Sequence, residues 1–159
     1  MQTNVWIILD TCAFLSQTHP AGKIATVNGI EDEIVNRQSK QYYSNLKSKG
    51  LKIVEPQNDS LRYIEKIAQK TGDLDVLSAI DQKILALGYE LEGIIITDDF
   101  SIQNVALYMK LKVVSCSGNK IKELRIWQYK CSACNQISKK KKETCVVCGS
   151  EDIFRIKAK

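Results

Sequence analysis

This sequence lacks the features that mark membrane and secreted proteins. Its 159 residues contain no uncharged apolar run near the roughly 20 residues that a membrane-spanning helix needs, so we expect no membrane partner. The segment Met1-Gln2-Thr3-Asn4 lacks the basic stretch of a secretory signal. We therefore expect a cytoplasmic protein whose six cysteines are metal ligands or buried thiols rather than disulfides.

Histidine is nearly absent as well, and this excludes two kinds of hydrolytic site. His19 is the single histidine, so a nuclease that uses two histidines as general acid and base is impossible. A Ser-His-Asp hydrolase would have to use His19, and the chain has no Gly-x-Ser-x-Gly motif. Because His19 precedes Pro20 in a loop-like stretch, we expect it to be an exposed loop residue.

The net charge of +5 is distributed unevenly along the chain. Residues 1–118 carry 12 Lys/Arg against 14 Asp/Glu, a net charge of −2, whereas residues 119–159 carry 11 against 4, a net charge of +7. This asymmetry indicates an acidic working part joined to a basic part that docks nucleic acid. The alternative is a basic tail that only keeps the protein in solution.

Strand-like and helical patterns alternate through the first 118 residues. Apolar strand runs cover residues 5–9, 51–54, 93–97 and 111–115, and helical patterns cover 11–16, 28–35, 42–49, 60–70, 77–91 and 102–109. This order predicts an α/β fold with a mostly parallel sheet flanked by helices. We place the first domain at 1–118, a connector at 119–127 and a second, cysteine-rich unit at 128–159.

Acidic residues follow two of the predicted strands. Asp10 ends the first strand and Asp98-Asp99 ends another, while Glu33 and Asp81 lie on predicted helices. Ligands of parallel sheets bind outside the carboxyl ends of the strands, and carboxylates gathered there repel one another unless a cation neutralises them. Oxygen ligands suit Mg²⁺ or Mn²⁺, which activate water and stabilise charge in phosphodiester cleavage.

Each acid also has a structural interpretation. Asp10 and Asp99 can cap the helices that follow them, Asp81 can form a buried ion pair, and Glu33 can be an exposed helix residue. Asp73, after Thr71-Gly72, is typical of a turn or cap. Two acidic α/β families are excluded. A haloacid dehalogenase needs Asp-x-Asp where this chain has Asp10-Thr11-Cys12, and a receiver domain needs a downstream strand-end Asp that is missing before residue 152.

The cysteine-rich unit carries the strongest motif of the sequence. Cys131-x-x-Cys134 and Cys145-x-x-Cys148 are separated by ten residues, the spacing of a structural, tetrahedral Zn²⁺ site. Two disulfides or an iron–sulfur cluster are the alternatives. The remaining cysteines, Cys12 and Cys116, lie in apolar surroundings and are expected to be inert buried thiols.

A lysine run, Lys139–Lys142, lies between the two cysteine pairs. We expect Lys139, Lys140, Lys141 and Lys142 to project as a loop that binds RNA backbone phosphates with little sequence preference. Trp127, Tyr129 and Phe154 either stack on unpaired bases or pack within the unit or against the first domain.

Several of these segments resemble a known family. They are Leu9-Asp10-Thr11, Glu33-Ile34, Leu77-Ser78-Ala79-Ile80-Asp81 and Thr97-Asp98-Asp99-Phe100, together with Thr71-Gly72-Asp73-Leu74 and Ile102-Gln103-Asn104-Val105-Ala106. The chain resembles a PIN-domain nuclease followed by a zinc ribbon, the short archaeal form of the Nob (NIN-one-binding protein) endoribonucleases.

The resemblance implies a metal-dependent endoribonuclease that trims the 3′ end of small-subunit pre-rRNA within a pre-ribosomal particle, where other assembly factors are further partners. It also implies a site of catalytic residues, the acids Asp10, Glu33, Asp81, Asp98 and Asp99. Asp10, Asp81 and Asp99 would hold Mg²⁺ or Mn²⁺. The choice within the Asp98-Asp99 pair stays open, although Asp99 matches the Thr-x-Asp spacing. Cys131, Cys134, Cys145 and Cys148 would hold structural Zn²⁺.

Other functions fit parts of the same sequence. A non-catalytic RNA-binding assembly factor would keep the acidic pocket without cleaving RNA. A toxin-type PIN ribonuclease would act on tRNA or mRNA, although such proteins usually lack a ribbon. A zinc-ribbon adaptor would use its α/β part only to bind proteins.

Overall fold

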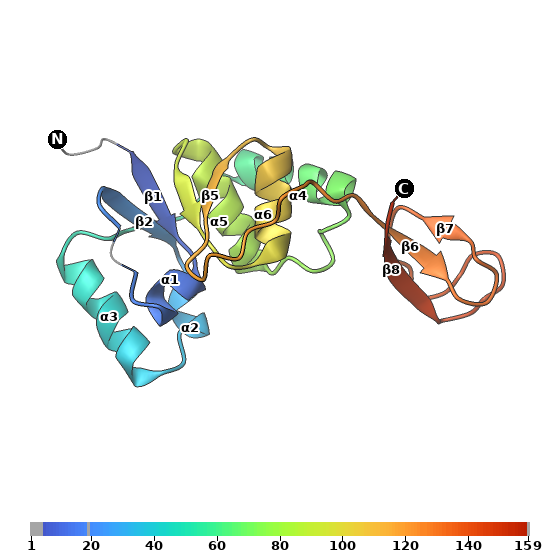
Figure 1. The fold of residues 1–159 in the computed structure, drawn as a ribbon, viewed down its shortest axis with the longest axis horizontal. Helices are drawn as coiled ribbons and strands as arrows, with labels where there is room; N and C mark the ends of the chain where they lie inside the picture. Colours follow the sequence, from blue (N-terminus) through green and yellow to red (C-terminus); the bar gives the residue numbers. More distant parts are fainter. Residues whose placement is uncertain (1–4, 19, 159) are drawn as a thin grey trace.

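The computed structural model describes residues 5–18 and 20–158 and contains two folded parts. An α/β domain is joined through an extended segment to a three-stranded ribbon, which projects beyond helix α4 (Asn58–Thr71) (Figure 1). His19 lies outside the described residues, so its expected exposure stays a prediction. Within the described part of the chain, no helix is long and apolar enough to cross a membrane.

A five-stranded parallel sheet forms the centre of the α/β domain, in the order β3-β2-β1-β4-β5. Its strands are β1 (Trp6–Leu9), β2 (Lys23–Val27), β3 (Lys52–Val54), β4 (Ile94–Ile96) and β5 (Lys112–Val114). β1 is central, and its residues Ile8 and Leu9 are fully buried because helices cover both faces. The predicted α/β fold with a parallel sheet is confirmed.

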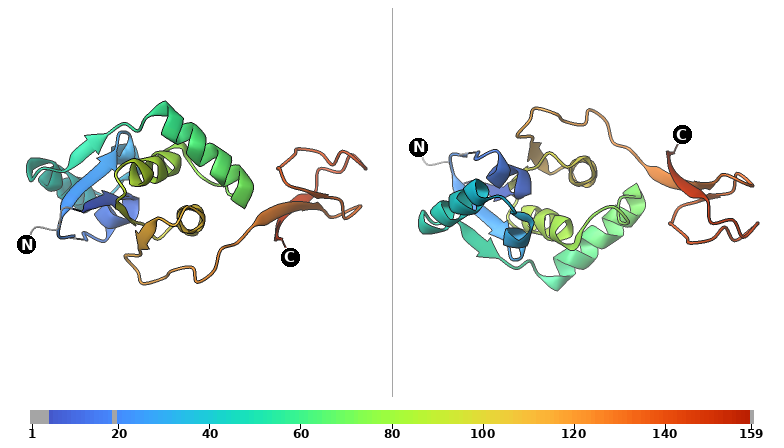
Figure 2. Two further views of the ribbon diagram at one scale, coloured as in Figure 1. Left: turned by 90° about the horizontal axis from the view of Figure 1, so that it is seen from above. Right: turned by 90° about the horizontal axis from the view of Figure 1, so that it is seen from below.

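The helices form a layer on each face of the sheet (Figure 2). One layer contains α1 (Thr11–Leu15), α2 (Ile30–Glu33) and α3 (Arg37–Ser48), and the other contains α4, α5 (Ala79–Glu90) and α6 (Phe100–Tyr108). Alternating residues of β1 contribute to two hydrophobic cores, one on each face of the sheet. Ile8 packs with α4, α5 and α6, whereas Ile7 and Leu9 pack with α1, α2 and α3.

The structure differs from the sequence prediction beside the central strand. Residues 23–27 form β2, which no apolar run indicated because Lys23 and Thr26 interrupt the pattern. The helix expected over 28–35 is only α2, since Ile34 already adopts an extended conformation. β1 and β4 lie next to each other although the chain visits β2 and β3 between them. Their carboxyl ends therefore border the crevice where such sheets bind ligands.

The ribbon consists of three antiparallel strands in the order β7-β6-β8. They are β6 (Trp127–Cys131), β7 (Ile137–Ser138) and β8 (Ile153–Lys157). The boundaries proposed at 118 and 127 stay predictions. β6 begins at Trp127, the last residue of the expected connector.

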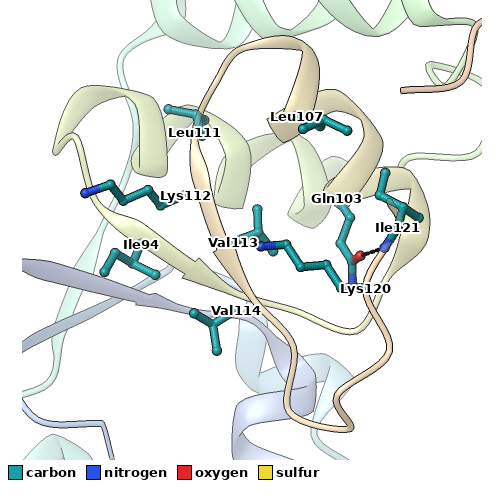
Figure 3. Close-up of a pocket in the computed structure, with 9 residues that line it drawn as sticks. All are labelled: Ile94, Gln103, Leu107, Leu111, Lys112, Val113, Val114, Lys120 and Ile121. Atoms are coloured by element: carbon teal, nitrogen blue, oxygen red, sulfur yellow. Dashed lines mark hydrogen bonds between the residues drawn. The ribbon is translucent and has the colours of Figure 1, made fainter. Parts of the chain in front are cut away.

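The connector is attached to α6 by two buried side-chain amides. Gln103 Oε1 accepts a hydrogen bond from the Ile121 backbone at 2.9 Å, and Asn104 Oδ1 accepts one from Arg125 at 2.8 Å. Figure 3 shows the first of these bonds at the edge of an apolar groove of about 370 Å³ that runs between the connector and β5. The two amides therefore set the path of the chain toward the ribbon.

Candidate active site and metal centres

Asp10 is buried at the carboxyl end of β1, where the strand passes into α1. Its Oδ1 atom accepts a hydrogen bond from the Thr11 backbone at 2.7 Å, which caps α1. Its Oδ2 atom accepts one from the Thr97 hydroxyl at 2.6 Å, at the end of β4. The capping interpretation is therefore correct for Asp10, and the same contacts hold its carboxylate at the border between β1 and β4.

Two further carboxylates, Asp81 and Glu33, lie close enough to Asp10 to act on its charge. Burial raises the pKa of Asp10 to about 6, and hydrogen bonds from Thr97 and Thr11 offset this only partly. The negative charges of Asp81 and Glu33 raise it further. Asp10, Glu33 and Asp81 thus form one electrostatic group, which we call the acidic cluster.

Each of these two partners is held in place by a neighbouring hydroxyl residue. Glu33 Oε2 accepts a hydrogen bond from the Thr11 hydroxyl at 2.5 Å. Asp81 forms a capping box at the start of α5, in which its Oδ2 atom accepts from the Ser78 backbone at 2.7 Å. The neighbouring Glu31 instead accepts a hydrogen bond from the Tyr43 hydroxyl, so Glu33 is the acid that this short helix directs to the cluster.

Thr97 connects the acidic cluster to Asp99. Its hydroxyl donates to Asp10 and accepts a hydrogen bond from the Asp99 backbone at 3.0 Å. The Asp99 carboxylate caps α6, with Oδ1 accepting from the backbones of Ser101 at 2.7 Å and Ile102 at 3.1 Å. Asp99 therefore lies beside the cluster with its carboxylate fixed by a helix end. Thr97 is a positioning residue to which the sequence analysis assigned no role.

Asp98 points in a different direction from its neighbour. Its Oδ1 atom accepts hydrogen bonds from the Ser115 hydroxyl at 2.5 Å and the Ser117 backbone at 3.1 Å, beyond the end of β5. Partial burial acts to raise the pKa of Asp98, but these hydrogen bonds outweigh it and lower the pKa below its usual range. The catalytic role suggested for Asp98 stays a prediction.

The acidic cluster fits a hydrated divalent cation. Its donors are carboxylate oxygens, and the charges of Asp81 and Glu33 add to burial in raising the pKa of Asp10. Among the described residues, no three of these carboxylates bring their ligand atoms within 4.8 Å of one another, so the cluster is open rather than closed around a bare ion. Mg²⁺ and Mn²⁺ suit such a site because they keep several waters.

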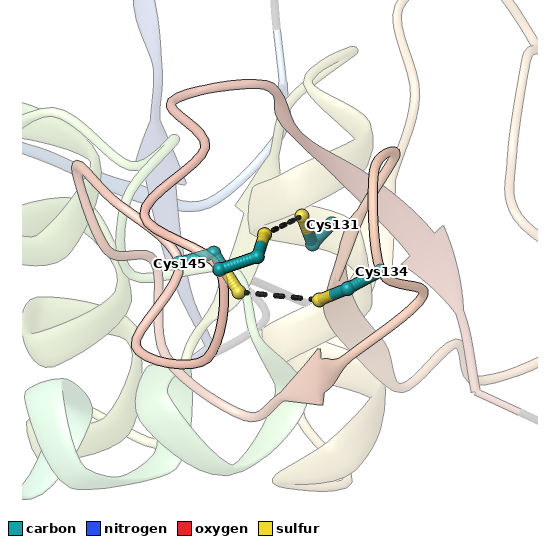
Figure 4. Close-up of side chains that lie close together, drawn as sticks. Cys131, Cys134 and Cys145 are labelled. Atoms are coloured by element: carbon teal, nitrogen blue, oxygen red, sulfur yellow. Dashed lines mark hydrogen bonds between the residues drawn. The ribbon is translucent and has the colours of Figure 1, made fainter.

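The four ribbon cysteines form a second centre with a different character. Their ligand atoms all lie within 4.8 Å of one another, with Cys131 and Cys148 sulfurs 3.6 Å apart and Cys134 and Cys145 sulfurs 3.5 Å apart (Figure 4). Within the second cysteine turn, the backbone N–H groups of Cys148 and Val147 face the Cys145 sulfur and lower the pKa of Cys145 to about 6. The cluster is compatible with Zn²⁺ in a closed, structural site.

Left-handed residues complete the two cysteine turns. Asn135 and Gly149 have φ values of 60° and 74°, and their backbone N–H groups donate to the carbonyls of Cys131 and Cys145. Gly149 is thus placed where the tight turn requires a left-handed residue.

Comparisons with known proteins agree with this architecture. The family model described as the PIN domain of ribonuclease matches residues 7–91. Endoribonuclease Nob1 of Pyrococcus abyssi is 35% identical over 153 residues, which cover 94% of this chain and 93% of that protein. The chain belongs to the Nob1 family of PIN-domain endoribonucleases.

Two further relatives are a yeast Nob1 protein and an archaeal ribonuclease of another name. The 20S-pre-rRNA D-site endonuclease NOB1 of Saccharomyces cerevisiae is 36% identical over 92 residues, 54% of this chain and 20% of that protein. Ribonuclease VapC1 of Thermoplasma acidophilum is 30% identical over 146 residues, 91% of this chain and 75% of that protein. The matching family model describes a ribonuclease domain, and the Pyrococcus relative is an endoribonuclease. This chain is therefore an endoribonuclease.

In this Nob1-family chain a basic groove lies between α4 and the ribbon. It has a volume of about 650 Å³ and is lined by Lys66 and Lys70 of α4, Trp127 at the start of β6, and Lys139 and Lys140 of the lysine run. The lysine run could be predicted from the sequence, but its partners on α4 could not, because their proximity depends on how the two parts pack. Tyr63, which is partly exposed on α4, also lines the groove.

The three aromatic residues of the ribbon lie in different environments in this Nob1-family chain. Tyr129 is buried and its hydroxyl donates to Asp75 at 2.7 Å, so it packs between the two parts. Trp127 lies under the Arg155 guanidinium, 4.3 Å from its ring centroid. Phe154 is 46% exposed, so its ring is open for stacking.

Proposed function

We propose that this endoribonuclease cleaves small-subunit pre-rRNA near its 3′ end, at the acidic cluster formed by Asp10, Glu33 and Asp81. The observation that carries the proposal is the convergence of these carboxylates on the β1–β4 border. Thr11 donates hydrogen bonds to both Asp10 and Glu33, and the charges of Asp81 and Glu33 add to burial in raising the pKa of Asp10. The substrate assignment is supported by the likeness to archaeal Nob1 proteins over nearly the whole chain and by the likeness to the yeast 20S-pre-rRNA D-site endonuclease.

Asp10 and Asp81 would hold the cation directly, with Glu33 and Asp99 at its margin. A bound Mg²⁺ or Mn²⁺ would lower the pKa of a water and neutralise charge that develops on the phosphodiester. The Asp10 carboxylate is held in one position because the residue is 6% exposed and both carboxylate oxygens accept hydrogen bonds. Thr97 keeps the orientation of Asp10, and Thr11 keeps that of Glu33.

The basic groove would carry RNA that approaches the cluster. Lys66 and Lys70 of α4 and the run Lys139–Lys142 are all exposed, so their ammonium groups are accessible to RNA phosphates. Tyr63 and Trp127 add aromatic surface to the same groove. Such a surface positions a backbone and leaves the choice of cleavage site to the particle that presents the RNA.

A cleavage assay tests the proposal. Purified protein is incubated with RNA that spans the 3′ end of small-subunit rRNA, with Mn²⁺ or with EDTA, beside Asp10→Asn. We expect one cut near the mature end that is lost with EDTA and in the variant. Wild-type rates in Asp10→Asn would overturn the carboxylate mechanism. Binding without cleavage, on this RNA and on intact pre-ribosomal particles, would support the assembly-factor alternative instead.

A second candidate is a toxin-type ribonuclease that acts on tRNA or mRNA. The likeness to the VapC1 ribonuclease, which extends over 91% of this chain, favours it. The same assay separates the two, because a toxin-type enzyme would cut tRNA or mRNA faster than the ribosomal fragment. The proposed cytoplasmic location is supported by the free state of all six cysteines, which is typical of a reducing compartment.

A further inference from the structure

Cys12 and Cys116 lie side by side although they are far apart in the chain. Their sulfurs are 3.4 Å apart, and both side chains are half-buried. Cys12 belongs to α1, and Cys116 follows β5. The two thiols are not joined, because a disulfide would hold the sulfurs about 2.0 Å apart. The two cysteines, expected to be inert buried thiols, are thus half-buried neighbours, and their inertness stays a prediction.

Asp98 completes a group of three ligands with these cysteines. The two sulfurs and a carboxylate oxygen of Asp98 all lie within 4.8 Å of one another. Ser115 and the Ser117 backbone hold the Asp98 carboxylate in this direction, away from the acidic cluster. Hydrogen bonds that orient a ligating carboxylate in this way are common around metal sites.

The geometry of the pair matches that of the ribbon centre in the same molecule. The ribbon sulfurs are 3.5 and 3.6 Å apart, and the Cys12–Cys116 separation is 3.4 Å. In both places a backbone N–H group faces a cysteine sulfur. At Cys12 it comes from Asp98, and at Cys145 it comes from Cys148. Such N–H groups stabilise the thiolate form that a metal requires.

We propose that Cys12, Asp98 and Cys116 bind a thiophilic divalent cation such as Zn²⁺. Two thiolates and one carboxylate suit Zn²⁺ and disfavour Mg²⁺, so this centre differs in ion class from the acidic cluster. Three protein ligands leave a fourth position for water or for the Thr18 hydroxyl, which lies 3.4 Å from the Cys116 sulfur. The bound ion would fasten together the carboxyl ends of β1, β4 and β5.

Oxidation of Cys12 and Cys116 to a disulfide is the alternative to metal binding. Burial, together with the neighbouring Cys116 thiol, raises the pKa of Cys12 well above its ordinary value. Without a metal the thiol form therefore dominates at neutral pH, and thiols react slowly with oxidants. A bound cation shifts the equilibrium from thiol to thiolate because it binds the thiolate sulfur directly.

Metal content of the full-length protein tests the proposal. Protein is purified with a non-chelating reductant and dialysed against Zn²⁺ with excess Mg²⁺, which occupies the acidic cluster. We expect two tightly bound zinc ions per wild-type chain, two in the control Ser44→Ala, which changes an exposed position of α3, and one in Cys116→Ser. One ion in the wild type, or two in Cys116→Ser, would overturn the proposal. So would a Cys12–Cys116 disulfide in freshly purified wild-type protein that binds a single ion.

A second measurement needs no variant and remains useful if Cys116→Ser fails to fold. Wild-type protein that already holds one zinc ion is alkylated with N-ethylmaleimide before and after a second equivalent of Zn²⁺, and modified cysteines are identified by mass spectrometry. We expect the second equivalent to slow modification of Cys12 and Cys116 specifically. Unchanged rates at both residues would contradict the proposed site.

Discussion

The Arg155 guanidinium of β8 forms an ion pair with the Asp73 carboxylate, with Nη2 2.5 Å from Oδ1. The Asp73 side chain is 2% exposed, and its other oxygen accepts a hydrogen bond from Asn104 at 2.6 Å. Arg155 also donates to the Gly72 carbonyl at 2.8 Å. Asp73, expected to be a turn or cap residue, therefore also attaches the ribbon to the α/β domain.

Replacing Arg155 by alanine should destabilise the protein strongly. The change leaves the buried Asp73 charge with only its Asn104 partner, and removal of one member of a buried pair costs about 3–5 kcal/mol. Urea unfolding measures the loss. The matched control is Lys157→Ala, which removes the exposed pair with Glu123 and should cost less than about 1 kcal/mol. Equal losses in both variants would contradict a fastening role for Arg155.

Gly72→Ala should disturb the same contact by crowding. Gly72 ends α4 with a φ of 77°, and a Cβ atom there would lie 2.5 Å from the Trp127 carbonyl oxygen. Gly118 is the control because it has a φ of 84° and open space around it. Gly118→Ala should therefore cost only the left-handed strain of about 1–2 kcal/mol. In thermal unfolding Gly72→Ala should lose more, and a loss no larger than the control would exclude the crowding.

Asp10→Asn should stabilise the protein at neutral pH when Mg²⁺ and Mn²⁺ are absent. Burial raises the pKa of Asp10 from 3.8 to about 6, so the folded state favours the protonated form. The stability that this group contributes is complete below its unfolded pKa of 3.8 and is lost as pH rises through about 6. Two pKa units amount to about 3 kcal/mol, the upper limit of the gain that Asp10→Asn gives near pH 7.

Urea unfolding at a series of pH values, with the ribbon zinc retained, checks this. The advantage of Asp10→Asn should shrink as the pH falls toward about 4. Asp59→Asn is the control, since the Asp59 side chain is 92% exposed and should give a difference that changes little with pH. A pH-independent advantage of Asp10→Asn would show that its charge is not the cause.

Thr97→Val should impair cleavage while it preserves the shape of the core. The change removes the hydroxyl that donates to Asp10 and accepts from the Asp99 backbone. Loss of a residue that orients a metal ligand commonly costs about 10–100-fold in activity. Because the Thr97 hydroxyl lowers the pKa of Asp10, the acidic limb of the pH–rate profile should also move to higher pH.

A second buried threonine provides the control for Thr97→Val. The Thr26 hydroxyl donates to the Leu9 carbonyl at 2.7 Å and contacts no acidic residue of the site. Thr26→Val should leave the pH–rate profile in place, even if it lowers stability. An equal shift in both variants would assign the effect of Thr97 to general packing.

Neutral replacement of Lys66, Lys70, Lys139 and Lys140 should weaken RNA binding and its dependence on salt. These lysines line one groove, so their phosphate contacts would be lost together. For a single strand, removal of four contacts lowers the slope of log affinity against log salt by up to about 3. The control replaces Lys40 and Lys49 of α3 and its end, away from the ribbon (Figure 1). Unchanged affinity in the groove variant would remove this surface from the RNA path.

Local patterns predicted much of the architecture. Short apolar runs predicted β1, β3, β4 and β5 because strands buried on both faces need continuous apolar residues. β2 was missed because Lys23 and Thr26 break such a run, and its place in the sheet depends on pairing with β1 and β3. The four ribbon cysteines were recognisable because each Cys-x-x-Cys spacing forms one short local turn, although packing of the ribbon brings the two turns together.

By itself, then, the sequence determined which residues follow each strand and which cysteines share a turn, since both depend on neighbours within a few positions. Tertiary structure decided what these residues face. Asp98 and Asp99 are adjacent in sequence, yet one turns to Cys116 and the other caps α6 beside Thr97. The pairs Asp73–Arg155 and Cys12–Cys116 join segments 82 and 104 residues apart. Contacts at such separations arise only from packing, because no local periodicity relates the two partners.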